Sequence, residues 1–121
     1  MKYTSFEELP CWQTARELCQ AVFKLIQTRP FSVDFSLKDQ IWRSSGSAMD
    51  NIAEGFDADS GKEFLRFLGY SQRSCSEVQS QLYRAFDCQY ISDEQFDFVY
   101  NLAQDYRKQV KNFRRYLKNY S

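Results

Sequence analysis

The sequence contains no histidine, and this absence excludes the commonest kinds of active site. Without an imidazole there is no Ser-His or Cys-His nucleophile pair, no imidazole general base and no Glu-x-x-His di-iron site of the helix-bundle type. No phosphate-binding loop or other recognisable catalytic cluster takes their place. We therefore expect that the protein is not an enzyme and needs no cofactor.

The four cysteines are too widely spaced to form a metal clamp. No two of them stand in a Cys-x-x-Cys motif, and there is no histidine to complete a zinc site, so the sequence predicts no metal centre. In a reducing compartment we expect buried or half-buried thiols. The cysteines are Cys11, Cys19, Cys75 and Cys88.

The sequence also lacks a net charge, because 16 Lys and Arg residues balance 16 Asp and Glu residues. A chain that is basic overall, as is usual for nucleic-acid-binding proteins, is excluded, but a local basic patch is not. No apolar run approaches the roughly 18 residues that a membrane span needs, and the acidic N-terminus does not resemble a signal peptide. We expect a cytoplasmic protein that does not enter a membrane.

Glycine and proline are scarce, with 4 and 2 residues, and β-branched residues rarely alternate with polar ones. Apolar residues instead recur at helical spacing, which predicts helices over 9–28, 36–55, 60 to about 88, and 92–120. A chain of 121 residues is long enough for a single domain covering 1–121. Four helices with short connections predict an all-α fold, an antiparallel up-down-up-down four-helix bundle.

Capping residues predict where these helices begin and end. Ser36 is expected to cap the second helix, and capping boxes are expected at Ser60–Glu63 and Ser92–Gln95. Gly55 is expected to end the second helix in the left-handed conformation. Gly46 lies in mid-helix, where glycine costs about 1 kcal/mol relative to alanine, and this indicates a packing reason for it.

A polar stripe runs along the second helix beside its apolar face. Two interpretations stay open: two solvated faces, or a hydrogen-bonded seam within the bundle or between subunits. The mixture of Ser, Asn and Gln with few charges favours the seam. The stripe comprises Gln40, Ser44, Ser47, Asn51 and Glu54, and the facing series on the third helix comprises Arg66, Tyr70, Arg73, Glu77 and Arg84.

Glu54 is a candidate structural residue because it lies at the negative end of the second helix dipole, where a carboxylate is unfavourable. We expect an ion pair with Arg43, Arg66 or Arg73 to compensate for this placement. A catalytic role is the lesser alternative, since no other catalytic group accompanies it. The surrounding acids do not have the spacing of an EF-hand calcium loop.

The C-terminal segment 106–121 contains several cations and no acid. Its cations either complement the helix dipole or form a strip that binds the phosphates of RNA or DNA, with support from Arg73 and Arg84. Neighbouring tyrosines could stack on bases. The strip consists of Arg107, Lys108, Lys111, Arg114, Arg115 and Lys118.

The first helix carries two adjacent apolar stripes, and aromatic residues make up 17% of the chain. One small core does not readily hide so much apolar surface. We therefore expect the protein to associate with copies of itself.

Several motifs along the chain resemble those of one known family. They are Phe6-Glu7-Glu8-Leu9, Trp12, Ala15, Leu37, Gln40, Arg43, Ser47, Asn51-Ile52-Ala53-Glu54-Gly55, Lys62-Glu63-Phe64, Phe67-Leu68, Ser71, Ser74, Glu77 and Gln81-Leu82. The family is that of the 23S rRNA intervening-sequence proteins, also called S23-type ribosomal proteins, which are related to the retroelement accessory protein Avd. The Asn-Ile-Ala-Glu-Gly run is the most specific of these motifs.

This resemblance implies an antiparallel four-helix bundle that assembles into a homopentamer, and for most members it implies no established activity. The Avd branch implies a basic pentamer that binds nucleic acid and a reverse transcriptase, whereas this sequence has no net charge. The expected function is therefore that of a non-enzymatic oligomeric binding or scaffold module, for which copies of itself are the expected partner and another protein is a further candidate. The alternative is a nucleic-acid-binding accessory protein of the Avd kind.

Overall fold

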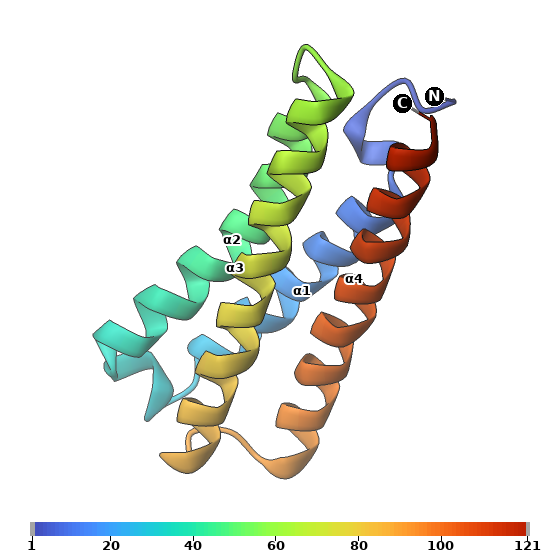
Figure 1. Ribbon diagram of the computed structural model, residues 1–121. Helices are drawn as coiled ribbons and strands as arrows, with labels where there is room; N and C mark the ends of the chain where they lie inside the picture. Colours follow the sequence, from blue (N-terminus) through green and yellow to red (C-terminus); the bar gives the residue numbers. More distant parts are fainter. Residues whose placement is uncertain (1, 121) are drawn as a thin grey trace.

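The chain folds into four antiparallel helices in this computed structural model, which describes residues 2–120 (Figure 1). The helices are α1 (Pro10–Ile26), α2 (Phe35–Phe56), α3 (Gly61–Asp87) and α4 (Asp93–Tyr120), and two short 3-10 turns, Phe6–Glu8 and Phe31–Val33, precede α1 and α2. Each helix packs on the next, and α4 packs back on α1 to close the bundle. The predicted all-α up-down-up-down topology is confirmed.

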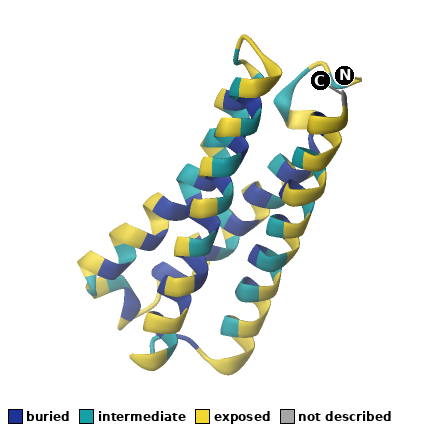
Figure 2. Ribbon diagram, in the orientation of Figure 1, coloured by how far each residue is buried: buried dark blue, intermediate teal, exposed yellow. Residues whose placement is uncertain are grey.

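The core lies along the bundle axis, where the inward faces of all four helices are buried (Figure 2). Leu18, Ile41, Leu68 and Val110 contribute one buried side chain from each helix. Tyr106 is fully buried among them, and its hydroxyl donates to the Ala48 carbonyl at 3.4 Å. The 3–4 spacing of apolar residues thus places the core as the sequence predicts.

The helix caps differ from the sequence expectation in two places. Asp34, not Ser36, caps α2: its carboxylate accepts a hydrogen bond from the Leu37 amide at 3.1 Å. At the start of α3, the Ser60 hydroxyl accepts from the Glu63 amide at 3.1 Å, but the Glu63 carboxylate turns outward to Arg66 at 2.6 Å. Of the two capping boxes that the sequence predicts, the one at Ser92–Gln95 has both of its hydrogen bonds.

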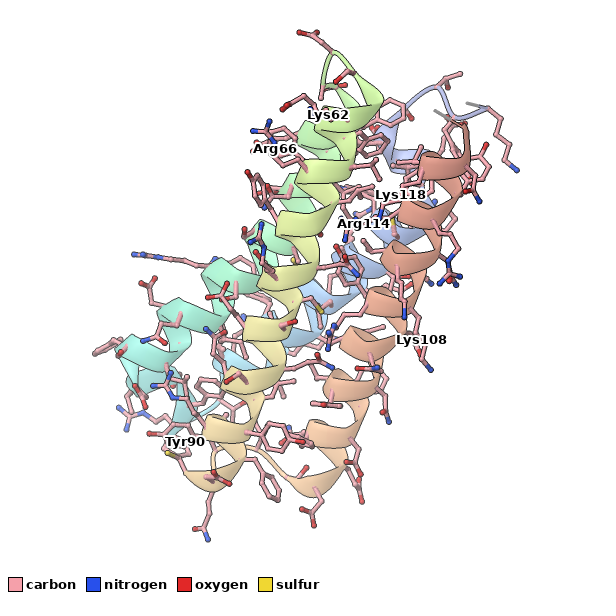
Figure 3. All side chains as sticks on the ribbon, in the orientation of Figure 1. Lys62, Arg66, Tyr90, Lys108, Arg114 and Lys118 are labelled. Carbon is pink, nitrogen blue, oxygen red and sulfur yellow. The ribbon has the colours of Figure 1, made fainter. Side chains whose placement is uncertain are left out.

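Asp34 also ties the start of α2 to the α3–α4 turn. Its second carboxylate oxygen accepts a hydrogen bond from the Tyr90 hydroxyl at 2.9 Å, and Tyr90 lies at the lower end of the bundle in Figure 3. The hydrogen bond from the Leu37 amide, followed by that from Tyr90, lowers the pKa of the Asp34 carboxyl. The turn itself is made by Gln89, which adopts the left-handed backbone conformation with φ of 63°.

The two glycines of α2 behave differently from the sequence expectation. Gly55 lies inside the helix and has no positive φ, so the prediction of a left-handed helix end is wrong. A β-carbon at Gly55 would lie 2.7 Å from Cβ of Phe67 and 2.8 Å from Cδ1 of Phe64, so its role is to let α3 approach. A β-carbon at Gly46 would meet nothing within 4 Å, so the packing reason expected for Gly46 is absent within the described chain.

Candidate protein- and nucleic-acid-binding surfaces

A hydrogen-bonded seam joins α2 to α3. The Ser74 hydroxyl donates to the Ser47 hydroxyl oxygen at 2.9 Å, and the Asn51 amide donates to the Ser47 carbonyl at 2.8 Å and to its hydroxyl at 3.0 Å. Lower in the bundle, Arg84 donates to the side-chain oxygen of Gln40 at 2.9 Å. The polar stripe of α2 therefore contacts α3 within one subunit, and of the five facing residues expected on α3 only Arg84 takes part in it among the described residues.

The charged residues of the same motif lie outside this seam. Arg43 is exposed and pairs with Asp39, one turn earlier on α2, at 2.9 Å. Glu77 is exposed on α3 and lines a shallow groove that also contains Arg43 and Gln81. Glu54 is exposed, and within the described chain it makes no ion pair or hydrogen bond, so the expected pairing with Arg43 or an arginine of α3 is wrong.

The outer surface formed by α1 and α2 exposes large aromatic side chains. Phe23 and Trp42 are 47% and 45% exposed, and their ring centroids are 5.7 Å apart. Phe35, at the start of α2, is 72% exposed. Two hollows share Trp42: one is bounded by Ile26 and Phe35, and the other is bounded by Cys19, Gly46, Met49, Asp50 and Glu54.

The basic strip of α4 is divided by the rotation of the helix. Four of its cations are exposed, while the guanidinium groups of Arg107 and Arg114 are half-buried against α3. Figure 3 shows Lys108, Arg114 and Lys118 along this part of α4. The exposed four are Lys108, Lys111, Arg115 and Lys118.

Glutamines of α3 hold the two half-buried arginines. Arg114 donates to the side-chain oxygen of Gln72 at 2.7 Å, and Arg107 donates to that of Gln79 at 2.9 Å. Gln79 in turn donates to Gln104 of α4 at 3.0 Å. Neither arginine has a carboxylate partner among the described residues. Sequence reasoning missed this arrangement, although the glutamines and the arginines share a spacing of seven residues.

The described part of the chain holds no cluster of metal-ligating residues. No group of three or more Cys, Asp or Glu residues within it could hold a metal ion. The thiols of Cys11 and Cys75 are buried and that of Cys19 is half-buried, as expected, but Cys88 is exposed, so the expectation is wrong there. None of the described helices is long and apolar enough to cross a membrane.

The family follows from comparison of the sequence with known proteins. The sequence profile of the 23S rRNA-intervening sequence proteins matches residues 7–112, which is most of the chain. The chain belongs to this family. No curated protein matches it.

A solved structure supports the fold of this family member. It is the crystal structure of a protein of unknown function from the S23 ribosomal protein family of Bacteroides thetaiotaomicron. It superposes with a TM-score of 0.78 at 22% sequence identity, covering 85% of this chain and 96% of that chain. The four-helix arrangement is therefore shared across a low sequence identity.

Proposed function

We propose that this family member is a non-catalytic homo-oligomeric scaffold of the cytoplasm, whose subunits associate through the outer surface of α1 and α2. The observation that carries this proposal is the exposed pair of Phe23 and Trp42, with Phe35 beside it. Exposed aromatic clusters around hollows are typical of protein interfaces, because their burial removes much apolar area from water. An assembly of five subunits rests on the family resemblance alone.

Gly46 adds a second argument for this surface. It lies within α2 between Trp42 and Asp50, and the space next to it is open, so its backbone is accessible to another chain. A glycine in a helix interior lowers stability by about 0.5–1 kcal/mol relative to alanine. The close approach of a neighbouring subunit would give this residue the packing role that it lacks within one chain.

Removing the aromatic pair should dissociate the oligomer. Because burying one such side chain contributes about 1.5–3 kcal/mol, Phe23→Ser with Trp42→Ser should weaken association at least tenfold while leaving the helical content unchanged. Light scattering coupled to size exclusion measures the mass over a range of micromolar concentrations. We expect a mass above the 14.4 kDa of one chain for the parent, and a mass close to it for the variant.

The control is Phe98→Ser, which removes an aromatic ring that is 67% exposed on α4. This variant should keep the parent mass. A parent that remains at 14.4 kDa at every concentration would disprove the oligomer. If the Phe23→Ser, Trp42→Ser variant has the same mass as the parent, the interface does not lie on the outer surface of α1 and α2.

A second candidate function is nucleic-acid binding by the exposed cations of α4. It is favoured by the fact that Lys108, Lys111 and Arg115 have no acidic partner among the described residues. Phosphate contacts of this kind do not depend on base sequence. Because the net charge is zero, we expect affinity for RNA to be micromolar or weaker at physiological salt.

Mobility shifts with RNA test this role. Lys111→Gln with Arg115→Gln should weaken binding to all sequences alike, because both side chains are exposed and their loss leaves the fold intact. Arg114 is left unchanged, since its hydrogen bond to Gln72 contributes to helix packing. The control is Lys24→Gln with Lys38→Gln, which removes the same amount of charge elsewhere on the surface. If both double variants bind RNA equally well, the strip is not the RNA-binding site.

A further inference from the structure

We propose that an acidic stripe on the outside of α2 binds the exposed basic stripe of α4 in a second copy of this chain. The acidic stripe consists of Asp50 and Glu54 of α2 and of Asp57, which directly follows α2. The basic stripe consists of Lys108, Lys111, Arg115 and Lys118. This inference rests on the proposed oligomer, and it identifies the second surface that such an assembly requires.

Neither stripe has an ion-pair partner among residues 2–120. Among the described residues the ion pairs are Arg43 with Asp39 and Arg66 with Glu63, so no member of either stripe is engaged. Two further cations, both on α3, are engaged in other ways: Arg73 lies over the Tyr70 ring at 5.1 Å, and Arg84 donates to Gln40. The basic stripe of α4 is therefore the largest group of available cations in the described chain.

The position of the two stripes prevents them from meeting within one subunit. In the closed order α1–α2–α3–α4, helices α2 and α4 lie diagonally across the bundle (Figure 1). Asp50 and Glu54 project from α2 on the side opposite its buried residue Ile41. On α4 the exposed cations lie on the outer side and on the flank next to α3, beside Arg107 and Arg114, which donate hydrogen bonds to α3. Because α2 and α4 do not pack on each other, their unlike charges can pair only between subunits. Such contacts run head to tail and form a ring or a filament.

The spacing of the charges also matches. Asp50, Glu54 and Asp57 are separated by four and three residues, and span about 10.5 Å along the helix axis. Lys111, Arg115 and Lys118 repeat that spacing when two helices run parallel. Arg115, Lys111 and Lys108 repeat it when they run antiparallel. Three opposite-charge pairs can therefore form in either orientation.

A second copy fits the basic stripe better than a nucleic acid does. The 16 basic residues of the chain are matched by 16 acidic ones, and the acidic stripe would repel a polyanion. The acidic stripe is also continuous with the proposed aromatic interface, because Asp50 and Glu54 border the same hollow as Trp42 and Met49. One neighbouring subunit could then cover aromatic and acidic side chains together.

The two parts of this interface would have different roles. Exposed ion pairs contribute little affinity each, so the aromatic residues of α1 and α2 supply most of the binding. Complementary charges instead select the orientation of the neighbour and speed its association. Assembly should therefore weaken as salt rises, and like-charge contacts should oppose it.

Charge reversal on each stripe tests the pairing. The basic-stripe variant is Lys111→Glu, Arg115→Glu and Lys118→Glu, and the acidic-stripe variant is Asp50→Lys, Glu54→Lys and Asp57→Lys. At low salt each should raise the dissociation constant of the oligomer at least tenfold, because every contact then joins like charges. A single chain with all six substitutions should assemble as the parent does. An equimolar mixture of the two variants should form more oligomer than either variant alone, because favourable contacts then join unlike chains. Circular dichroism checks that each variant keeps its helices.

Recovery in the six-substitution chain and in the mixture would support the pairing, because misfolding or loss of a nucleic-acid site could not be reversed in this way. If both single-stripe variants assemble like the parent while the Phe23→Ser, Trp42→Ser variant dissociates, the pairing of the stripes is overturned and the proposed oligomer remains. If the parent is monomeric, both fail. If only the basic-stripe variant is affected, is not rescued and has lost RNA binding, the stripe binds nucleic acid and the pairing is wrong.

Discussion

Gly55→Ala should destabilise the subunit by about 1–3 kcal/mol, whereas Gly46→Ala should stabilise it by about 0.5–1 kcal/mol. Both residues lie inside α2, so both substitutions gain the same helix propensity. At Gly55 the new methyl group would lie 2.7 Å from Cβ of Phe67, which is attached to the backbone of α3 and cannot simply rotate away. At Gly46 there is no atom within 4 Å for it to meet.

Urea unfolding of the monomer measures the two effects separately from association. Both substitutions are introduced into the Phe23→Ser, Trp42→Ser background, in which the subunits should not associate. The midpoint should then fall for Gly55→Ala and rise for Gly46→Ala. Equal shifts of the same sign would mean that helix propensity alone determines the change in the urea midpoint. The close approach of α2 and α3 at Gly55 would then be contradicted.

The sequence predicts the four helices and the core well, because these follow from a periodicity contained within each segment. Leu37, Ile41 and Ile52 recur at helical spacing and are all buried. The role of Gly55 could not be predicted in this way, because it depends on which residues of α3 lie opposite. A glycine just before a segment rich in Asp and Ser is equally typical of a helix end. Only the position of Phe64 and Phe67 separates the two interpretations.

The candidate surfaces were harder to predict for a related reason. The sequence alone groups charges that lie close together into one strip. Each residue turns a helix by about 100°, however, so Arg107 and Arg114 point toward α3. The unfavourable position of Glu54 at the helix end indicated a partner. The described chain provides none, and the acid instead lies with Asp50 on the outer surface of α2. Charge patterns identify which residues are unusual, but the partner is decided by the packing of helices.

A thiol reagent added to the folded protein should modify Cys88 rapidly, and Cys11 and Cys75 only when the protein unfolds. Cys88 is exposed just after α3, whereas burial raises the pKa of the Cys11 and Cys75 thiols to about 12. Because the thiolate is the reactive form, only about one in 10⁴ of the buried thiols would be ionised at pH 8 even if a reagent could reach them. Burial raises the pKa of Cys19 to about 11, so its reaction should be intermediate in rate.

A chromogenic disulfide reagent distinguishes these thiols by counting the rapid reactions per chain. One fast thiol is expected in the folded protein and four in urea, and Cys88→Ser should abolish the fast phase without changing the urea total. Cys19 adds a test of the proposed interface, because it borders the hollow that contains Trp42. Its reaction should therefore be faster in the Phe23→Ser, Trp42→Ser variant than in the parent oligomer. A fast phase that persists in Cys88→Ser would show that a second thiol is open to solvent and would contradict the burial of the core cysteines.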